Sequence, residues 1–273
     1  TGYPIAKIAA QLAVGLTLDE IDNEITKSTP VSFEPALDYI IVKIPRWDFE
    51  KFKVPSNLTT QMKSVGEVMS IGSNFREAFQ KAFRSLEIGA DGLDYKGLDK
   101  YDDEYIISKL VVPTPMRPFF IKEAFKRGMS LEKIQTHTNI DPWFLDNILE
   151  IVEVEKEISE SKFEELEVES LKSYKLHGFS DSQIGRLLNK DSELIRSKRK
   201  ELKVLPTYKK VDTCAAEFEA HTPYFYSTYM TENESIPVDR KKIIVLGGGP
   251  FRIGQGIEFD YCASQASMIL KDM

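Results

Sequence analysis

A glycine-rich segment near the end of the chain has the residue types of a phosphate-binding loop. Residues 241–262 read KKIIVLGGGPFRIGQGIEFDYC, an apolar run followed by glycines. A strand, a glycine turn and a helix N-terminus together form an anion site in dinucleotide-binding folds. The pattern departs from G-x-G-x-x-G, because Arg252 holds the third glycine position after Gly247 and Gly249. We therefore expect a strand over 241–246, but no complete dinucleotide site.

Two carboxylates follow this loop, and two interpretations of them stay open. Glu258 and Asp260 lie about one turn into the helix expected after the glycines. The helix dipole favours a carboxylate there, so these residues can be helix caps or functional groups. Other candidates are sparse. The histidines lack metal-ligand spacing (His137, His177 and His221), and the two cysteines, expected to be buried and reduced, form neither a disulfide framework nor a zinc pattern (Cys214 and Cys262).

The sequence ends before such a nucleotide-binding unit is complete. A parallel βαβ unit needs a second strand, and the chain stops at Met273. The opening TGYPIAKIAAQLAVG already follows a helical pattern, so we expect a piece cut from something longer. We also expect residues 234–273 to be poorly ordered unless they dock on the rest of the chain.

The first zone, residues 1–86, reads as mixed α/β. Its opening helix has apolar residues at helical spacing and ends at Gly15: Ile5, Ile8, Ala9 and Leu12. Thr17 and Glu20 form a capping box that predicts a second, short helix. LDYIIVKIPRW predicts a strand, KSVGEVMSIG a second strand or turn, and SNFREAFQKAFRSLEIGA an amphipathic helix. The buried face of that helix is predicted to carry Phe75, Phe79, Ala82, Phe83 and Leu86.

The second zone, residues 87–233, is predicted to be almost entirely helical and contains a degenerate repeat. KRGMSLEKIQTHTNIDPWFL (126–145) matches LHGFSDSQIGRLLNKDSELI (176–195) at an offset of 50 residues. The identities fall at Gly128/Gly178, Ser130/Ser180, Ile134/Ile184, Asn139/Asn189 and Asp141/Asp191. In each copy the Gly is expected to end one helix, the Ser to cap the next and the Asp to cap a third.

This repeat also suits a helix-turn-helix protein, but the charges disfavour nucleic acid. Residues 150–169 contain nine Glu and two Lys, which would repel phosphate. The basic run RSKRK at 196–200 is more typical of a solvated helix face. The net charge of −7 also disfavours nucleic acid and anionic membranes. No apolar run approaches a membrane span, and no signal peptide is visible, so a cytoplasmic protein is expected.

Four longer strings resemble a known family. SFEPALDYIIVKIPRWDFEKF, LTTQMKSVGEV, VDTCAAEFEAHTPYFYSTY and VLGGGPFRIGQGIEFDYC are similar to the large subunit of carbamoyl-phosphate synthetase. The resemblance covers the whole chain and is looser from about 90 to 205. It implies an enzyme with two tandem ATP-grasp halves and a helical oligomerisation domain between them. The first half makes carboxyphosphate, which ammonia converts to carbamate, and the second half phosphorylates carbamate.

On that resemblance the chain is the middle of such an enzyme. Residues 1–86 would be the C-terminal part of the carboxyphosphate domain, 87–233 the oligomerisation domain, and 234–273 the start of the carbamoyl-phosphate domain. The expected fold is α+β and mainly α, with a helical module between incomplete α/β pieces. These pieces are an ATP-grasp C-terminal part and the first βα unit of a Rossmann-like pre-ATP-grasp domain.

The family's catalytic signatures are not found in this part. The ATP loop and the E-x-N metal signature are absent, since Asn233 directly follows Glu232. The resemblance implies Mg-ATP, with Mn²⁺ or K⁺, in the whole enzyme and none of them in this chain. It also implies a glutaminase small subunit that supplies ammonia from glutamine, two ATP consumed, and a product for pyrimidine and arginine synthesis. We expect no independent catalysis, because phosphoryl transfer needs those metals and a phosphate loop.

Three residues are candidates for an internal tunnel, which the family uses to pass unstable intermediates. QMKSVGEVM and GQGIEF resemble stretches that line its carbamate part, which selects Met62, Gly256 and Glu258. Met62 as core filler and Gly256 as a turn residue are the competing interpretations. Two functions remain open: a scaffold that joins two synthetase halves and self-associates, or a chain that retains weak ATP or anion binding at the Gly247–Gly256 loop.

Overall fold

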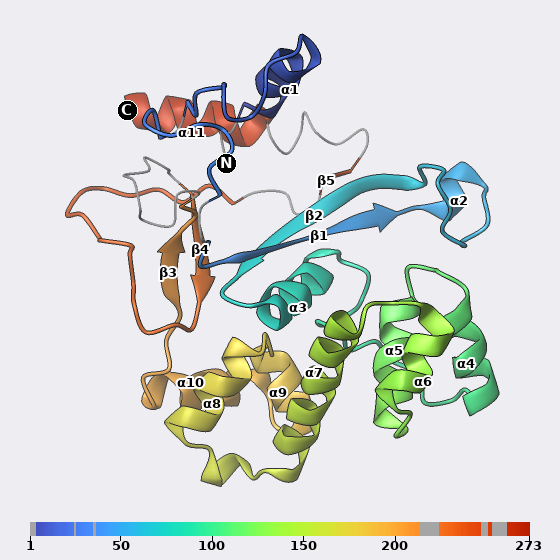
Figure 1. Cartoon of the computed structure of the whole chain (residues 1–273). Helices are drawn as coiled ribbons and strands as arrows, with labels where there is room; N and C mark the ends of the chain where they lie inside the picture. The colour runs from blue at the N-terminus through green and yellow to red at the C-terminus, as the bar shows by residue number, and fades with distance from the viewer. Residues whose placement is uncertain (1–3, 25, 35–36, 213–223, 247–250, 253–260) are drawn as a thin grey trace.

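The computed structural model describes residues 4–24, 26–34, 37–212, 224–246, 251–252 and 261–273. Two antiparallel strands cover one side of a central helix, and a group of further helices covers the other side (Figure 1). The strands are β1 (Ile40–Trp47) and β2 (Ser64–Gly72), and the central helix is α3 (Phe75–Ser85). The fold is mixed α+β with a helical module, as the sequence predicts.

The strand predicted in the first zone is confirmed, the segment predicted as a strand or turn forms a second strand, and the alternating burial of the two explains why they pair. Ile40 lies opposite Gly72 and Ile44 opposite Val68, so the hairpin has one register over most of its length. The inward residues Val42 and Val68 are buried against the helix, while Ile41 and Lys43 face away. Beyond β1 lies the short helix α2 (Phe49–Phe52). This hairpin gives α3 a fixed apolar surface to pack on.

Helix α1 (Ile5–Ala13) forms as predicted, whereas the second short helix does not. Gly15 follows the end of α1 with φ of 107°, a left-handed conformation that suits glycine. The Thr17 amide donates to the Glu20 carboxylate at 2.9 Å, so half of the expected capping box is present. Residues 18–20 nevertheless form only a turn. The prediction of a helix was wrong because a cap satisfies the first amides but supplies no apolar surface on which further turns can pack.

The predicted buried face of α3 is confirmed in its second half. Ala82, Phe83 and Leu86 are buried, and Phe75 and Phe79 lie partly buried against the same core. The helix begins where the side chain of Asn74 accepts a hydrogen bond from the Glu77 amide at 3.0 Å. Two polar side chains of α3, Glu77 and Gln80, are also buried, which its hydrophobic pattern did not predict.

The helical module occupies most of the chain after α3 and contains its largest core. Its helices in chain order are α4 (Asp103–Val111), α5 (Arg117–Lys126), α6 (Leu131–Thr138), α7 (Pro142–Glu160), η1 (Phe163–Glu165), α8 (Val168–Leu176), α9 (Asp181–Leu187) and α10 (Ser192–Glu201). One core of buried residues runs from Val42 and Val68 in the hairpin through α3 to Ile195 in α10. This core includes residues on both sides of Leu86, and so crosses the predicted boundary between the first two zones. The division into 1–86, 87–233 and 234–273 stays a prediction.

The repeat is confirmed at every matched position. Gly128 and Gly178 end α5 and α8 with φ of 80° and 86°, and Asn139 and Asn189 both have φ of 53°. These are left-handed positions, which Gly and Asn adopt at low cost. Each copy therefore turns its chain at the same two points.

The caps and the core residue of the repeat also agree. Ser130 and Ser180 accept hydrogen bonds from the amides three residues on, at 3.3 and 2.9 Å. The first helical turns of α7 and α10 are capped in the same way by the carboxylates of Asp141 and Asp191. The apolar member of the motif is fully buried in both copies: Ile134 and Ile184. Five identities, four at helix ends and one in the core, thus predicted a shared local structure.

The last zone departs from the predictions in two ways. The strand expected over 241–246 does not form, and Ile244 and Leu246 are 84% and 86% exposed. A parallel strand needs a neighbour for its amides and carbonyls, and β5 (Phe251–Arg252) pairs with β2 instead. Cys262 was expected to be buried and is exposed at the start of α11 (Cys262–Asp272), whereas Cys214 lies outside the described residues.

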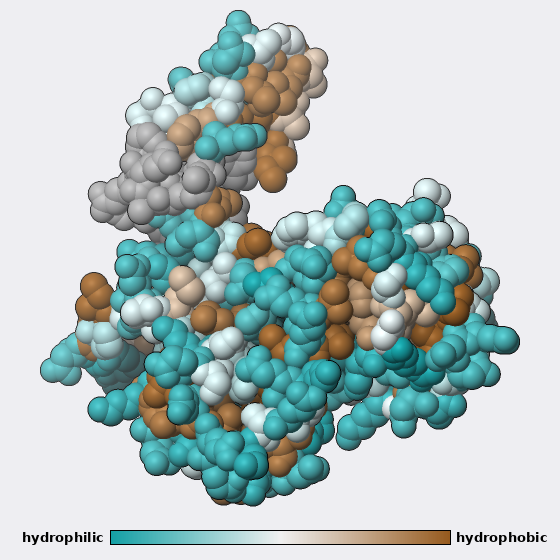
Figure 2. Space-filling view, turned by 60° about the horizontal axis from the view of Figure 1, so that its bottom comes forward, coloured by the Kyte–Doolittle hydropathy of each residue, from teal (hydrophilic) through white to brown (hydrophobic). Residues whose placement is uncertain are grey.

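A short second sheet lies within residues 87–233, which were expected to be almost entirely helical. Strand β3 (Thr207–Lys210) pairs antiparallel with β4 (Phe225–Thr228), with Lys209 opposite Tyr226. The polar segment that follows β4 lies along β3: the Glu234 amide donates to the Tyr208 carbonyl at 2.8 Å. Seen from the helical side, the surface is mainly hydrophilic with separate hydrophobic areas (Figure 2). Among the described residues, no helix is both long and apolar enough to cross a bilayer.

Candidate functional site: a buried polar junction on α3

The carboxylate of Glu77 is the centre of a buried junction between three parts of the chain. Its side chain is 1% exposed. One oxygen, Oε2, accepts hydrogen bonds from the Ser73 amide at 2.8 Å, the Ser73 hydroxyl at 2.7 Å and the Thr228 hydroxyl at 3.0 Å. The other, Oε1, accepts from the Lys81 ammonium at 2.7 Å. A buried carboxylate is tolerated only when it is paired and hydrogen-bonded in this way.

Lys81 extends the junction to both sheets. Its ammonium donates to the Ile71 carbonyl of β2 at 3.1 Å and also to the Ser227 carbonyl of β4. Burial lowers the pKa of Lys81, and the charge of Glu77 opposes that shift. One ammonium therefore contacts β2, α3 and β4 at once. Thr228, which completes the contact from β4, is fully buried.

A second set of α3 side chains holds the turn of the second repeat copy. The side-chain amides of Asn74 and Gln80 donate to the carbonyls of Leu176 and His177 at 2.9 and 2.7 Å. Arg84 donates to the next carbonyl, that of Gly178, at 2.9 Å. The last carbonyls of a helix have no partner within the helix, so α3 caps α8 through three consecutive residues.

Two buried glutamines close this contact. The amide of Gln183 donates to the side-chain oxygen of Gln80 at 2.9 Å, and its own oxygen accepts from the Ser180 amide at 2.9 Å. Gln80 and Gln183 are 0% and 2% exposed. Buried amides that satisfy each other fix one arrangement of the two helices, because any slip would leave several polar groups without partners.

A second charged cluster lies where α8, α9 and α10 meet Tyr229. Asp181 accepts from the Lys175 ammonium at 2.9 Å and from the Arg199 guanidinium at 3.0 Å. Both cations lie over the ring of Tyr229, at 5.2 and 5.6 Å from its centroid. Burial raises the pKa of Asp181, but the Arg199 hydrogen bonds and the charge of Lys175 outweigh it and leave the pKa below its usual value.

Lys175 makes the stability of the chain vary with pH in the alkaline range. Burial lowers its pKa from 10.5 to about 8, against the attraction of Asp181. Between these values the unfolded chain binds a proton that the folded chain has released. The free energy of unfolding therefore gains up to about 1.4 kcal/mol per pH unit over this window. We expect the stability of the native sequence relative to Lys175→Met to rise from pH 8 upward.

Urea unfolding of both proteins across this pH range tests the expectation. The tyrosines whose pKa is raised by burial, Tyr174, Tyr226 and Tyr229, are present in both proteins, so their own titration is common to both unfolding curves. A difference that stays constant or falls with pH would show that Lys175 keeps its charge in the folded chain.

The tunnel candidates are not brought together by the described structure. Met62 lies in the connection before β2 with its side chain 74% exposed, and Gly256 and Glu258 lie outside the described residues. The glycines of the Gly247–Gly256 loop lie outside them as well. The tunnel assignments and the anion-binding alternative stay predictions. No group of His, Cys, Asp and Glu within the described ranges could hold a metal ion.

The junction itself was missed by sequence reasoning, although a signal exists. Polar residues recur at a spacing of three to four along α3: Asn74, Glu77, Gln80, Lys81 and Arg84. This second stripe beside the apolar one indicates a helix with partners on two sides. Of the histidines, His177 bonds to Glu150 at 3.0 Å, His137 is not part of the junction, and His221 lies outside the described residues.

The basic run at 196–200 does not form a free cationic surface. Arg199 is 8% exposed and bound to Asp181 and to the Val204 carbonyl. Arg196 and Lys198 lie within 4 Å of the carboxylates of Glu193 and Glu201 on the same helix. Three of the four cations in the run are paired in this way, which leaves little positive charge for a phosphate backbone. The contacts therefore favour a structural role for this run.

Comparison with known proteins agrees with this architecture. The family model described as the oligomerisation domain of the carbamoyl-phosphate synthetase large chain matches residues 67–203. The family model described as the carbamoyl phosphate synthase preATP-grasp domain matches residues 239–273. Residues 67–203 include all of α3 and the helices through α10, and thus most of the polar junction.

Relatives from distant organisms are similar along the whole chain. The carbamoyl phosphate synthase large chain of Myxococcus xanthus is 51% identical over 277 residues, which cover 100% of this chain and 26% of that protein. Those of Nostoc and Archaeoglobus fulgidus are each 53% identical, over 99% and 100% of this chain and 25% and 26% of their own lengths. The chain spans about a quarter of the relatives that it matches. It belongs to the carbamoyl-phosphate synthetase large-chain family.

Proposed function

We propose that this chain is a non-catalytic central segment of a glutamine-dependent carbamoyl-phosphate synthetase. It would connect the two ATP-dependent synthetase halves and carry the self-association surface of the large subunit. The observation that carries the proposal is the junction on α3. Through Glu77 and Lys81, α3 binds β2 on one side and β4 on the other. Segments that would lead into the two halves are thus fixed to one helix.

The wider chemistry of the enzyme is part of the same proposal. The large chain would act as a cytoplasmic ligase that uses bicarbonate, ammonia from glutamine and two ATP, and supply pyrimidine and arginine synthesis. Its glutaminase small subunit and its Mg-ATP sites, with Mn²⁺ or K⁺, would lie on other parts of the protein. The names of the relatives and the two matched family models support this assignment.

Self-association is the part of the proposal that this chain can test alone. Sedimentation velocity from low-micromolar to near-millimolar concentration should show a mass that rises from 31.1 kDa toward that of a dimer. A reversible association depends on concentration by mass action, and closed twofold dimers are the commonest product. A single 31.1 kDa species at every concentration would contradict an association surface within these residues.

A further inference from the structure

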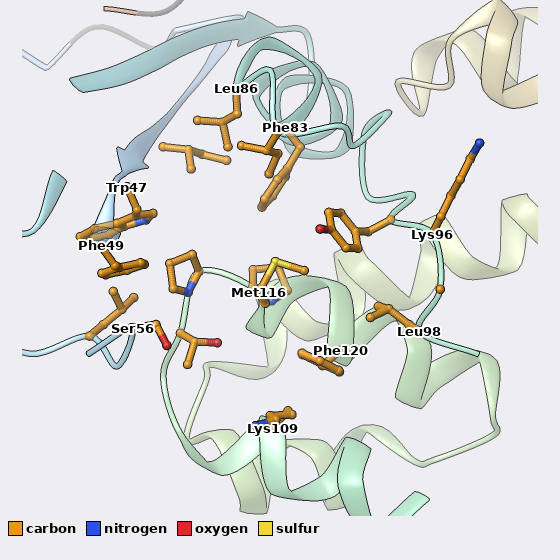
Figure 3. A pocket seen from close by; sticks show the side chains of 18 of the residues that line it. Trp47, Phe49, Ser56, Phe83, Leu86, Lys96, Leu98, Lys109, Met116 and Phe120 are labelled. Carbon is orange, nitrogen blue, oxygen red and sulfur yellow. The ribbon is translucent and has the colours of Figure 1, made fainter. Parts of the chain in front are cut away.

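A pocket of about 1060 Å³ opens between the hairpin and helices α4 and α5 (Figure 3). One wall comes from residues 44–58 and the other from residues 95–120. Phe83 of α3 and Leu86, just after that helix, lie between them. The pocket thus straddles the predicted domain boundary at Leu86. Small-molecule sites are concentrated at such boundaries, and this volume is at the upper end of their usual size.

Stacked aromatic pairs stand on both walls. Trp47 and Phe49 lie parallel on the hairpin side, with ring centroids 5.9 Å apart and planes within 7°. Tyr101 and Tyr105 stack on the helical side, at 4.2 Å and 15°. Figure 3 shows Trp47 and Phe49 at one side of the pocket and Phe120 and Met116 within it. Aromatic rings on both walls favour an aromatic ligand.

The charges that line the pocket are mainly positive. Lys100 and Lys109 lie over the rings of Tyr101 and Tyr105, at 5.0 and 4.7 Å from the centroids. No carboxylate in the described part of the chain lies within ion-pair distance of either lysine. Arg46 adds a third cation, and Glu50 is the acidic residue among those that line the pocket. Lys96 extends away from it in Figure 3.

We propose that this pocket binds a small planar aromatic anion. The ring system would lie among the aromatic side chains of the two walls, and its carboxylate, sulfonate or phosphate would face Lys100 and Lys109. An extended polypeptide fits less well, because it would need free backbone groups in the wall. The Leu58 amide, which lines that wall, already donates to the Pro113 carbonyl at 2.7 Å.

The test uses the emission of Trp47 and a matched pair of probes. The chain has two tryptophans, so Trp143→Phe leaves Trp47 as the single reporter. 1-Anilinonaphthalene-8-sulfonate should quench it with one-site saturation. N-Phenyl-1-naphthylamine, which has the same rings without the sulfonate, should bind roughly tenfold more weakly, because it gains nothing from the lysines.

Charge variants separate the pocket from general hydrophobic binding. K100Q/K109Q in the W143F background should weaken binding of the sulfonate probe roughly tenfold and leave binding of the neutral probe unchanged. K133Q/K200Q, which removes two exposed lysines on α6 and α10, should change neither. The proposal is overturned if Trp47 is not quenched, if both probes bind equally, or if the two double variants behave alike. It is also overturned if an acidic polypeptide quenches Trp47 and the sulfonate probe does not.

Discussion

Replacing Glu77 with alanine is expected to lower the free energy of unfolding by about 3 kcal/mol. The substitution leaves the Lys81 ammonium buried without its carboxylate and removes the acceptor for Ser73 and Thr228. The Lys81 side chain is 23% exposed, which places the loss at the low end of the range for broken buried pairs. Urea unfolding monitored by circular dichroism measures this loss. An unchanged dependence of the unfolding free energy on urea concentration (the m value) would show that only stability has changed.

Two further variants serve as comparisons for Glu77→Ala. Glu77→Gln keeps an acceptor for both hydroxyls and removes the charge, so a loss of about half that size is expected. Glu160→Ala removes one partner of an exposed pair, Lys156–Glu160 at 3.8 Å, and should cost less than about 0.5 kcal/mol. If E77A costs no more than E160A, the junction does not hold the chain together.

The second large effect is expected from the glycine of the second repeat copy. Gly178 has φ of 86°, and an added Cβ would lie 3.0 Å from the Glu77 Cα and 3.1 Å from the Arg76 carbonyl. Gly178→Ala therefore combines a left-handed alanine with a clash against the backbone of α3. We expect a loss of about 3 kcal/mol, from about 1–2 of backbone strain and a similar term for overpacking.

The first repeat copy supplies the matched control. Gly128 has nearly the same conformation, with φ of 80°, but an added Cβ would have no atom within 4 Å. Gly128→Ala should cost only the backbone strain, about 1 kcal/mol. The difference between the two variants measures the docking of the second copy on α3, in the same urea experiment. Equal losses would mean that this copy is not held against α3 as described.

The sequence predicts local structure in this chain better than it predicts long-range contacts. The repeat was predicted correctly because Gly, Ser, Asn and Asp act through their own backbone neighbourhood, as Ser130 and Asn139 do. Strand β1 was predicted from its β-branched residues, whereas β2 was predicted only as a strand or turn and the pairing of the two was not predicted. By contrast, the contact between Glu77 and Thr228 joins residues 151 positions apart, and no local pattern encodes such a separation.

The failed predictions have the same cause. Residues 241–246 have the composition of a buried strand, but a strand forms only where a neighbouring strand accepts its hydrogen bonds. Thr17 and Glu20 make the expected contact, yet a cap alone does not sustain a helix. In both cases local propensity was read correctly and tertiary partners decided the outcome. The pocket beside Trp47 could not be predicted either, because its two walls are far apart in sequence.

The central claim is that this chain joins two synthetase halves and contains no nucleotide site of its own. A calorimetric titration with Mg-ATP, with bicarbonate present, tests it most directly. The K100Q/K109Q chain is the proper sample, because the substitutions weaken anion binding at the aromatic pocket. We expect no saturable heat at millimolar Mg-ATP. Saturable binding would contradict the claim and would make the Gly247–Gly256 loop the first place to mutate.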